Sequence, residues 1–298
     1  MELSILIISY KSLLKLKKCI SHIGPKREII IVENSNKAKI KEEIEKKYKN
    51  CKVIINGSNF GYGRACNIGL KQVSNQYVLI LNTDVIINYA KIKTIESEII
   101  KLKNNFAAAS PISDDLINFL GNKVDPYLEN KKININKKKN FSKIDIVKGH
   151  SLIINLKKFK NKNIFDENFF FFFEEIDLCR RLKKASENIY IFNKIKIYHE
   201  TGGSIDSKSK YKQIYNDFRN WNYLWSRFYY YKKHYGYLIS FIKHFSKLNK
   251  YFLKCIFFYF FSKIKFRNNK FRFMGLICSM LGVKSSISDK IIEKISLK

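Results

Sequence analysis

The segment 78–84 constrains the fold more than any other part of this chain. Four apolar residues, 78–81, run without a break into the polar triplet Asn82-Thr83-Asp84. A short continuous apolar run predicts a buried strand, and its end delivers an acid to the sheet edge where open α/β sheets bind ligands. A metal ion and phosphates could meet at such an acid. The triplet is equally typical of an ordinary polar turn, so this segment alone leaves both interpretations open.

Alternating apolar and amphipathic segments predict a parallel sheet covered by helices. Residues 3–9 and 28–32 read as short buried strands, with a lysine-rich amphipathic helix between them at about residues 13–23. Further strands are expected at residues 52–55 and 77–81, which complete a nucleotide-binding-like half.

The second half of the chain changes character. The Lys/Asn run 131–143 is expected to be an exposed loop, with a second set of strands beginning at Ile144. From residue 211 onward the strand signal disappears, and aromatic and basic residues follow a helical pattern. We therefore expect a catalytic α/β domain over residues 1–205 and a basic, aromatic-rich helical region over residues 206–298.

The cysteines and apolar segments bear on the compartment. The six cysteines are scattered without a CxxC pair or zinc-like spacing, which predicts free thiols in a reducing environment. The first ten residues are apolar but lack the basic start, length and cleavage site of a signal peptide, so we expect a cytoplasmic catalytic part. No segment reaches the ~18 uncharged apolar residues of a spanning helix. The nearest, 255–261, is cut off by Lys254 and Lys263.

A glycine-rich segment precedes the predicted strand that leads to Asp84. It contains Asn59, Gly61, Arg64 and Asn67, and its spacing is neither GxGxxG nor a Walker motif. Glycines permit close backbone approach, and Arg64 could reach a diphosphate. A loop that only caps the next helix is an equally open interpretation.

A cluster of acids follows five consecutive phenylalanines. Glu174, Glu175 and Asp177 precede a helix-like segment, where the helix dipole favours negative charge in any case. A carboxylate beside an apolar block is also suited to general-base work. Both interpretations remain open at this point.

His199 ends another predicted strand and enters a glycine-containing loop. A lone histidine is more often structural than a ligand. However, an imidazole and a carboxylate at neighbouring strand ends could share a divalent cation that also binds diphosphate oxygens.

The order of these motifs resembles the inverting GT-A glycosyltransferases of family 2, and most closely the bacterial rhamnosyltransferase-like enzymes of cell-surface polysaccharide synthesis. The matching motifs are Ser9-Tyr10, Glu33-Asn34-Ser35, Asn59 through Asn67, Asn82-Thr83-Asp84, Gly149, Phe165-Asp166-Glu167, Glu174 through Arg181, and His199. Arg219-Asn220 and residues 229–236 resemble the family's C-terminal extension, so the resemblance covers roughly residues 3–236.

The resemblance implies a GT-A domain, that is, a Rossmann-like nucleotide-diphospho-sugar transferase, with a helical C-terminal extension. It implies that Asp84 and His199 hold the metal and that Glu175 is the catalytic base, with Glu174 and Asp177 as competitors. The donor-binding residues would be Ser9, Tyr10, Glu33, Asn59, Gly61, Arg64, Asn67, Asn82 and Gly149. The chain departs from the family twice, because Glu33 replaces the common aspartate and Glu175 places a longer side chain at the base position.

The resemblance therefore implies a metal-dependent transfer, with Mg²⁺ or Mn²⁺, of a sugar such as rhamnose. The donor would be a nucleotide-diphosphate sugar and the acceptor a glycan or lipid-linked glycan. Two rivals stay open. One is a catalytically degenerate GT-A scaffold. The other is a nucleic-acid-binding protein, because the net charge is +32 and aromatics among bases can stack on single strands. Nucleic acid is not the expected partner, since it leaves Asp84, Glu175 and His199 without a common purpose.

The basic tail has two interpretations. Residues 206–298 hold 20 Lys/Arg against 4 Asp/Glu, and bases alternate with aromatics over residues 211–273. This pattern suits a helix lying in the interface of an anionic membrane, which would make the protein peripheral at the inner face of the cell membrane. A buried helical bundle with its bases on one solvated face fits the same pattern.

Overall fold

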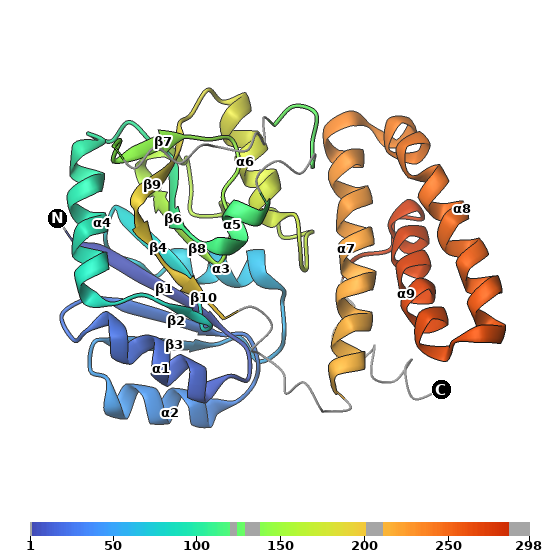
Figure 1. Ribbon diagram of the computed structural model, residues 1–298. Coiled ribbons are helices and arrows are strands. Elements are labelled where there is room, and N and C mark those ends of the chain that lie inside the picture. The colour runs from blue at the N-terminus through green and yellow to red at the C-terminus, as the bar shows by residue number, and fades with distance from the viewer. Residues whose placement is uncertain (1, 120–123, 129–137, 201–210, 286–298) are drawn as a thin grey trace. The chain divides into compact units, whose positions relative to one another are not determined.

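The computed structural model describes residues 2–119, 124–128, 138–200 and 211–285. The chain divides into two compact units (Figure 1). The α/β unit comprises Met1–Phe60, Arg64–Asp166 and Glu175–Ser204, and the helical unit comprises Gly61–Gly63, Glu167–Glu174 and Ile205–Lys298. The predicted domain boundary after residue 205 lies outside the described residues and stays a prediction.

An eight-stranded mixed sheet forms the centre of the α/β unit, in the order β3-β2-β1-β4-β8-β6-β9-β7. Its strands are β1 (Leu3–Ser9), β2 (Ile29–Glu33), β3 (Cys51–Ile55), β4 (Tyr77–Asn82), β6 (Ala108–Ile112), β7 (Phe141–Lys143), β8 (Ser151–Asn155) and β9 (Ile189–Lys196). The first four strands are parallel, as the sequence predicts. The expectation of a parallel sheet is wrong for β8, which runs antiparallel to β4 and β6, and for β7, which runs antiparallel to β9.

Helices cover both faces of the sheet because its strands are apolar on both sides. Alternate residues of β1 pack with α1 (Leu13–Ile23), α2 (Ala38–Lys47) and α4 (Tyr89–Lys101) in one buried core. On the opposite face α3 (Tyr62–Leu70) approaches β1 so closely that a Cβ atom on Gly69 would lie 2.2 Å from Leu6. The predicted strands of the first half and the predicted helix α1 are confirmed to within a residue or two.

Of the expected loop at residues 131–143, residues 138–140 form a turn as expected, whereas the expectation is wrong for residues 141–143. Phe141–Lys143 forms the edge strand β7, and the next strand, β8, begins at Ser151 rather than at Ile144. The physical reason is local, because the Phe141 ring packs edge-on against Tyr190 of β9, with 5.3 Å between ring centroids. One aromatic in a Lys/Asn-rich run is too weak a pattern to reveal an edge strand. Residues 129–137 are not described.

Short elements connect the strands of the large sheet and add a second, smaller sheet. A two-stranded sheet joins β5 (Val85–Ile86) to β10 (Tyr198–His199). The short helix α5 (Asp114–Phe119) follows β6, the 3₁₀ turn Leu156–Lys158 follows β8, and α6 (Glu174–Lys184) precedes β9.

The helical unit contains α7 (Tyr211–Tyr235), α8 (Tyr237–Phe261) and α9 (Lys263–Met280), which confirms the helical pattern expected from residue 211. Trp221, Trp225 and Phe271 form its buried core. Helices α7 and α9 touch backbone to backbone, because a Cβ atom on Gly275 would lie 2.2 Å from the carbonyl oxygen of Trp221. Within the described ranges, every helix is too short or too polar to cross a bilayer.

Candidate active site

A buried glutamate organises the carboxyl ends of β1 and β2. Glu33 is fully buried, and its carboxylate accepts hydrogen bonds from Ser9 Oγ (2.6 Å), Ser35 Oγ (2.5 Å) and the backbone N–H of Lys11 (2.9 Å). Both carboxylate oxygens are therefore engaged by the protein. The structure brings the predicted donor-binding residues Ser9 and Glu33 together, and it uses Glu33 to fix the two strand ends.

The neighbouring Asn34 holds the following loop in place. Its amide nitrogen donates to Asn59 Oδ1 at 2.9 Å, and its amide oxygen accepts from Asn56 Nδ2 and from the backbone N–H of Phe60, both at 3.0 Å. Asn59, a predicted donor-binding residue, thus belongs to the same network as Glu33. Asn34 is not among the predicted donor-binding residues, although it lies in the matching motif Glu33-Asn34-Ser35.

Four other predicted donor-binding residues serve different parts of the structure. Arg64 is exposed, with its guanidinium 4.4 Å from the centre of the Phe60 ring, and the Lys11 amine lies 4.8 Å from the Tyr10 ring.

Asn67 is buried, and its amide group donates to the carbonyl and accepts from the N–H of Phe165, each at 2.9 Å. Gly61, in the helical unit, has a φ of +84°, and a Cβ atom there would lie 2.4 Å from the Phe170 carbonyl oxygen. Asn67 and Gly61 therefore fasten the backbone that leads to the acidic helix.

Asp84 and His199 meet at the end of β4, as the sequence predicts for a shared site. The pairing of β5 with β10 sets His199 opposite Val85, next to Asp84, and the Glu200 N–H donates to the Asp84 carbonyl at 2.9 Å. The Nε2 atom of His199 lies 3.2 Å from Oδ1 of Asp84. Both side chains are largely buried, at 15% and 12% exposure.

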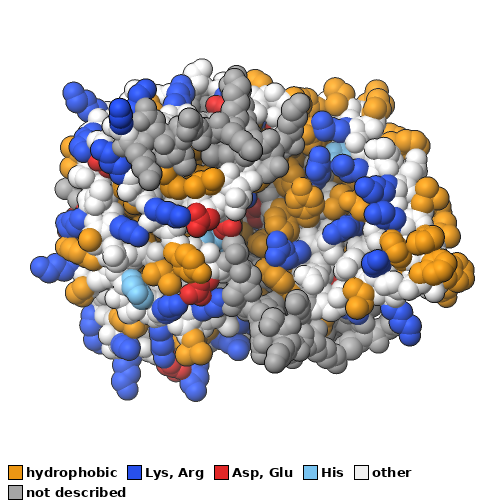
Figure 2. Space-filling view, in the orientation of Figure 1, with side chains coloured by type: hydrophobic (Ala, Val, Ile, Leu, Met, Phe, Trp, Pro, Cys, Tyr) orange, Lys and Arg blue, Asp and Glu red, His pale blue; other side chains and the backbone are white. Residues whose placement is uncertain are grey.

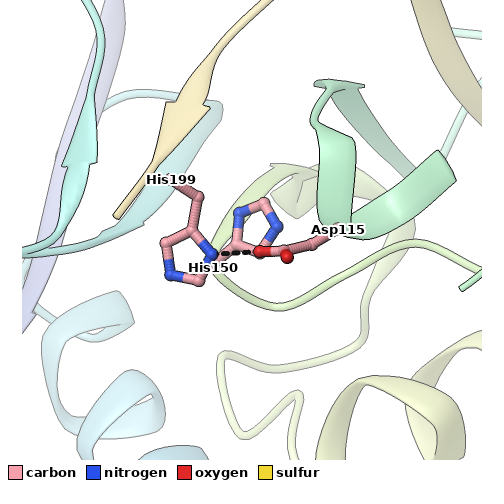
Figure 3. A group of neighbouring side chains, drawn as sticks. All are labelled: Asp115, His150 and His199. Carbon is pink, nitrogen blue, oxygen red and sulfur yellow. Dashed lines mark hydrogen bonds and ion pairs between the residues drawn. The ribbon is translucent and has the colours of Figure 1, made fainter. Parts of the chain in front are cut away.

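Two further residues complete this cluster, and sequence reasoning missed both. Asp115 of α5 binds His199 Nδ1 through its Oδ2 atom, and the His150 ring stacks on that of His199 with 4.4 Å between centroids (Figure 3). Asp115, His150 and His199 each offer a ligand atom, and the three atoms lie within 4.8 Å of one another.

The position of His150 follows from the direction of β8. Because β8 runs antiparallel to β4, its first residues lie at the edge where β4 ends, and the N–H of Asn82 donates to the His150 carbonyl at 3.0 Å. Of the predicted site residues, Asn82 makes this contact, and Gly149 is the residue before His150. A polar residue before an apolar run was the available signal for His150, but it is informative only once the strand is known to be antiparallel.

The electrostatics of the cluster follow from burial and charge. Burial lowers the pKa of His199, but hydrogen bonds and charge from Asp84 and Asp115 outweigh it and raise that pKa above its usual value. Burial raises the pKa of Asp84, and His199 outweighs it so that the net shift is downward. Burial, followed by the charge of His199, lowers the pKa of His150 to about 3. His150 is therefore neutral at physiological pH.

The donor set of this cluster suits a divalent cation. Oδ1 of Asp84 and Nδ1 of His150 are buried, and neither makes a well-aligned hydrogen bond with any residue in the described part of the chain. A buried polar atom without such a partner is costly, and a bound ion is one way to satisfy it. A carboxylate and neutral imidazoles are ordinary ligands of divalent metals.

The three predicted acids of α6 differ in their surroundings. Asp177 is fully buried and bonded to Nε of Arg181 at 2.8 Å, four residues along the same helix. Glu174 is buried as well and belongs to the helical unit. Glu175 is 15% exposed, and Lys148 Nζ lies 3.5 Å from its Oε1 atom. Of the three carboxylates, Glu175 is the one with access to solvent.

Comparison with known proteins places the chain in a class. The sequence model of glycosyl transferase family 2 matches residues 4–174, so the chain belongs to that family and is a glycosyltransferase. A relative in Haloferax volcanii, the low-salt glycan biosynthesis hexosyltransferase Agl10, is 27% identical over 233 residues, which cover 74% of each chain. The solved mannosyltransferase PcManGT from Pyrobaculum calidifontis, in complex with GDP-Man and Mn²⁺, matches with a TM-score of 0.55 over 94% of this chain and 87% of that one. Its sequence identity is 8%, so it shows likeness of fold, and the predicted GT-A fold with C-terminal helices is confirmed.

Proposed function

We propose that this protein transfers a sugar, with inversion, from a nucleotide-diphosphate donor to a hydroxyl of a glycan or lipid-linked glycan in surface polysaccharide synthesis. The observation that carries the proposal is the meeting of Asp84 and His199 at the carboxyl end of β4, 3.2 Å apart, in a family 2 domain. Rhamnose is the first donor sugar to test, because the ordered motifs resemble rhamnosyltransferase-like enzymes.

The donor would lie along the carboxyl ends of β1, β2 and β4. Ser9, Glu33 and Asn59 belong to connected hydrogen-bond networks there, so the groups around the nucleotide are fixed before it binds. Asp84 and His199 would hold Mg²⁺ or Mn²⁺. When bound, the cation neutralises the diphosphate and stabilises its charge as a leaving group.

Glu175 would act as the base. Its carboxylate takes the proton of the acceptor hydroxyl as that oxygen forms a bond to the anomeric carbon. The bond from the anomeric carbon to the diphosphate oxygen breaks, and its electron pair leaves with the diphosphate. Attack from the side opposite the leaving group inverts the anomeric centre.

The relatives support this chemistry by class. One is named as a hexosyltransferase of glycan biosynthesis, and the fold relative was solved with a nucleotide-diphosphate sugar and Mn²⁺. These ligands belong to those proteins, and we extend to this chain the class of donor and cation. The donor sugar itself depends on pocket residues that a likeness of fold does not fix.

The acceptor side of the proposal rests on the surface of α8. Its inward face packs on the bundle, whereas its outward face carries a line of apolar side chains at spacings of three, four and seven residues. This line contains Leu238, Ile242, Phe245, Phe252, Ile256 and Tyr259, which are between 48% and 69% exposed. Phe260 and Phe261 extend it with exposures of 76% and 71%. Such residues are unfavourable in water unless another apolar phase covers them.

A line of lysines runs along α8 about half a turn from this apolar line, with the exposed side chains of Ile239, Leu253 and Phe257 between the two. Lys243, Lys247, Lys250 and Lys254 repeat at the same spacing, and residues 237–280 hold nine Lys/Arg and no Asp/Glu. Figure 2 shows apolar and basic side chains side by side on the part of the surface that α8 forms. Apolar rings flanked by cations suit the headgroup level of an anionic bilayer. We therefore propose that the protein is cytoplasmic and peripheral at the inner face of the cell membrane, close to a lipid-linked acceptor.

The proposal is tested by thermal stabilisation with a panel of nucleotide diphosphates and Mn²⁺, followed by hydrolysis assays with the matching nucleotide sugars. Selective stabilisation by one nucleotide diphosphate and metal-dependent hydrolysis are expected. Stabilisation without hydrolysis or transfer would favour the degenerate scaffold, and no stabilisation by any nucleotide would contradict donor binding.

A further inference from the structure

Asp115 lies outside every motif used above, yet it contacts the predicted metal ligand. It is the second residue of α5, and its Oδ2 atom makes a close ion pair with Nδ1 of His199, 84 residues away in the chain (Figure 3). The other ring nitrogen, Nε2, faces Asp84 Oδ1 at 3.2 Å. The two nitrogens of one imidazole thus face two different carboxylates.

This arrangement gives the two carboxylates different tasks. A histidine that binds a metal through one nitrogen keeps its proton on the other, and that N–H is usually held by a carboxylate or carbonyl oxygen. Here Asp115 can accept the Nδ1 proton, which leaves the Nε2 lone pair directed to the side of Asp84. If Nε2 instead donated its proton to Asp84, the Nδ1 lone pair would face the Asp115 carboxylate. No nitrogen of the ring would then be left to bind a cation beside Asp84.

The surroundings of Asp115 fix it in this position. Ser113 Oγ accepts the N–H of Leu116 at 3.2 Å, which caps α5, and the same Oγ lies 3.1 Å from Nε2 of His150. The His150 ring then stacks on the His199 ring at an interplanar angle of 22°. The helix that carries Asp115 is therefore tied to the imidazole that Asp115 contacts.

We propose that Asp115 is a positioning residue, which holds His199 by its Nδ1 proton so that Nε2 binds the cation together with Asp84. This inference rests on the proposed function, since it assigns the cation to the donor site described above. It gives Asp115 no contact with the donor and no part in proton transfer from the acceptor.

A direct metal site made by Asp115, His150 and His199 is the competing arrangement. Imidazole lone pairs lie in the ring plane, and two rings stacked 4.4 Å apart at 22° do not aim their lone pairs at one ion. The geometry therefore favours the positioning role, and the competing site becomes an outcome of the test.

The first experiment measures the affinity of the full chain for Mn²⁺ alone, by calorimetry or electron paramagnetic resonance. Asp115→Ala should weaken Mn²⁺ binding about 10- to 100-fold, as is typical for loss of a carboxylate behind a metal-bound histidine. Asp115→Asn should recover much of that loss, because its amide oxygen can still accept the Nδ1 proton. Asp114→Ala is the matched control, since Asp114 is the preceding residue, is 62% exposed and pairs with Lys196.

A second measurement reads the imidazole itself. The chain has five histidines, so ¹⁵N labelling resolves them, and Zn²⁺ serves as a diamagnetic probe. In the unaltered protein the Nδ1 proton of His199 should be shielded from exchange while Nε2 binds Zn²⁺. In Asp115→Ala the Nδ1 proton should exchange rapidly with water.

The outcomes separate this inference from the proposed function. Equal Mn²⁺ affinity of Asp115→Ala and Asp114→Ala, with binding lost in Asp84→Ala, would overturn the positioning role and leave the donor site intact. Equal losses in Asp115→Asn and Asp115→Ala would identify Asp115 as a direct ligand and also overturn it. No Mn²⁺ binding by the unaltered chain would contradict both the metal site and this inference.

Discussion

The strand ends of the α/β unit and the outer surface of α8 differ in how far their charges are balanced by groups of opposite charge. At the strand ends each charged group faces a partner, so that Glu33 is held by three donors and His199 lies between two carboxylates. Along α8 and α9 nine bases occur without one acid. A neutralised, buried cluster has local and specific effects, whereas an unneutralised surface acts at longer range on any anionic partner. In the proposed function, chemistry and docking would therefore belong to different units.

Two histidines express the same contrast. His199 in the α/β unit has a raised pKa because its two carboxylate partners outweigh burial. His244 in the helical unit is completely buried, and its Nδ1–H donates to the Ser240 carbonyl at 2.8 Å. Burial, followed by nearby bases, lowers its pKa to about 4. One residue type thus has its pKa shifted in opposite directions in the two regions.

The largest expected effect comes from Asp84→Ala. This change removes the carboxylate that would hold the cation at the diphosphate, so metal-dependent donor binding should be abolished, a larger loss than the ~10- to 100-fold typical of outer-shell changes. Calorimetric titration with the stabilising nucleotide diphosphate and Mn²⁺ measures it. His199→Ala should weaken the same binding less, and unchanged affinity in folded Asp84→Ala protein would remove the metal assignment.

Glu175→Gln separates chemistry from binding. Glutamine keeps the shape of the side chain but cannot accept a proton, so turnover should fall by about 10²- to 10⁴-fold while donor affinity is retained. Single-turnover kinetics with saturating donor measures the change. Asp177→Asn and Glu174→Gln are the matched comparisons, and normal turnover in Glu175→Gln with an inactive Glu174→Gln would move the base by one residue.

Replacing the four lysines of α8 by glutamine tests the docking surface. Each basic residue near an anionic bilayer contributes roughly 1 kcal/mol, so partitioning onto anionic liposomes should weaken by roughly 2–4 kcal/mol at low salt, with little binding to neutral liposomes. The control removes four exposed lysines of the α2 region, Lys37, Lys39, Lys46 and Lys47, with the same change in net charge. Equal loss in both variants would show that net charge, rather than α8, drives binding.

A chain truncated near Gly236 would test the docking surface less cleanly than these whole-chain variants. Such a chain lacks α9, and α9 covers the backbone of α7 at Trp221. Its solubility would therefore report on an uncovered α7 as well as on the loss of α8.

The remaining predictions concern the dependence of stability on pH. Below about pH 6.5 the unfolded chain binds a proton at residue 244. Folded protein does not bind it until about pH 4, so His244 lowers the free energy of unfolding by up to about 3 kcal/mol over that interval. His244→Gln should flatten this part of the pH profile, measured by urea denaturation.

His199 should show the opposite slope. Because its folded pKa is raised, its contribution to stability is complete below the unfolded pKa and is lost as pH rises through the folded pKa. His199→Gln should therefore cost more stability near pH 6 than near pH 9. Parallel pH profiles for the two variants would contradict the contrast between the regions.

The sequence predicts those parts of the fold and site that depend on local pattern. Continuous apolar runs identify β1 to β4, because such strands are buried whatever follows them. The acid that follows the fourth run identifies Asp84. Local pattern does not reveal Asp115 or His150. His150 reaches the site because β8 runs antiparallel to β4, and Asp115 because it lies on the short helix α5, and distant segments determine both arrangements. Local pattern does not reveal the outward face of α8 either. Its apolar residues occur on both sides of the helix, and only packing decides which side stays in water.

The pairing of β5 with β10 has a consequence for synthesis of the protein. Strand β5 leaves the ribosome long before His199 does, and His199 in turn follows Asp115 by 84 residues. The nascent domain therefore cannot close this two-stranded sheet until nearly all of the α/β unit has been translated, and contacts of such long separation form late. A half-made chain presents Asp84 without its histidine. Asp84 and His199 could therefore hold a metal ion together only after nearly all of the α/β unit has been synthesised.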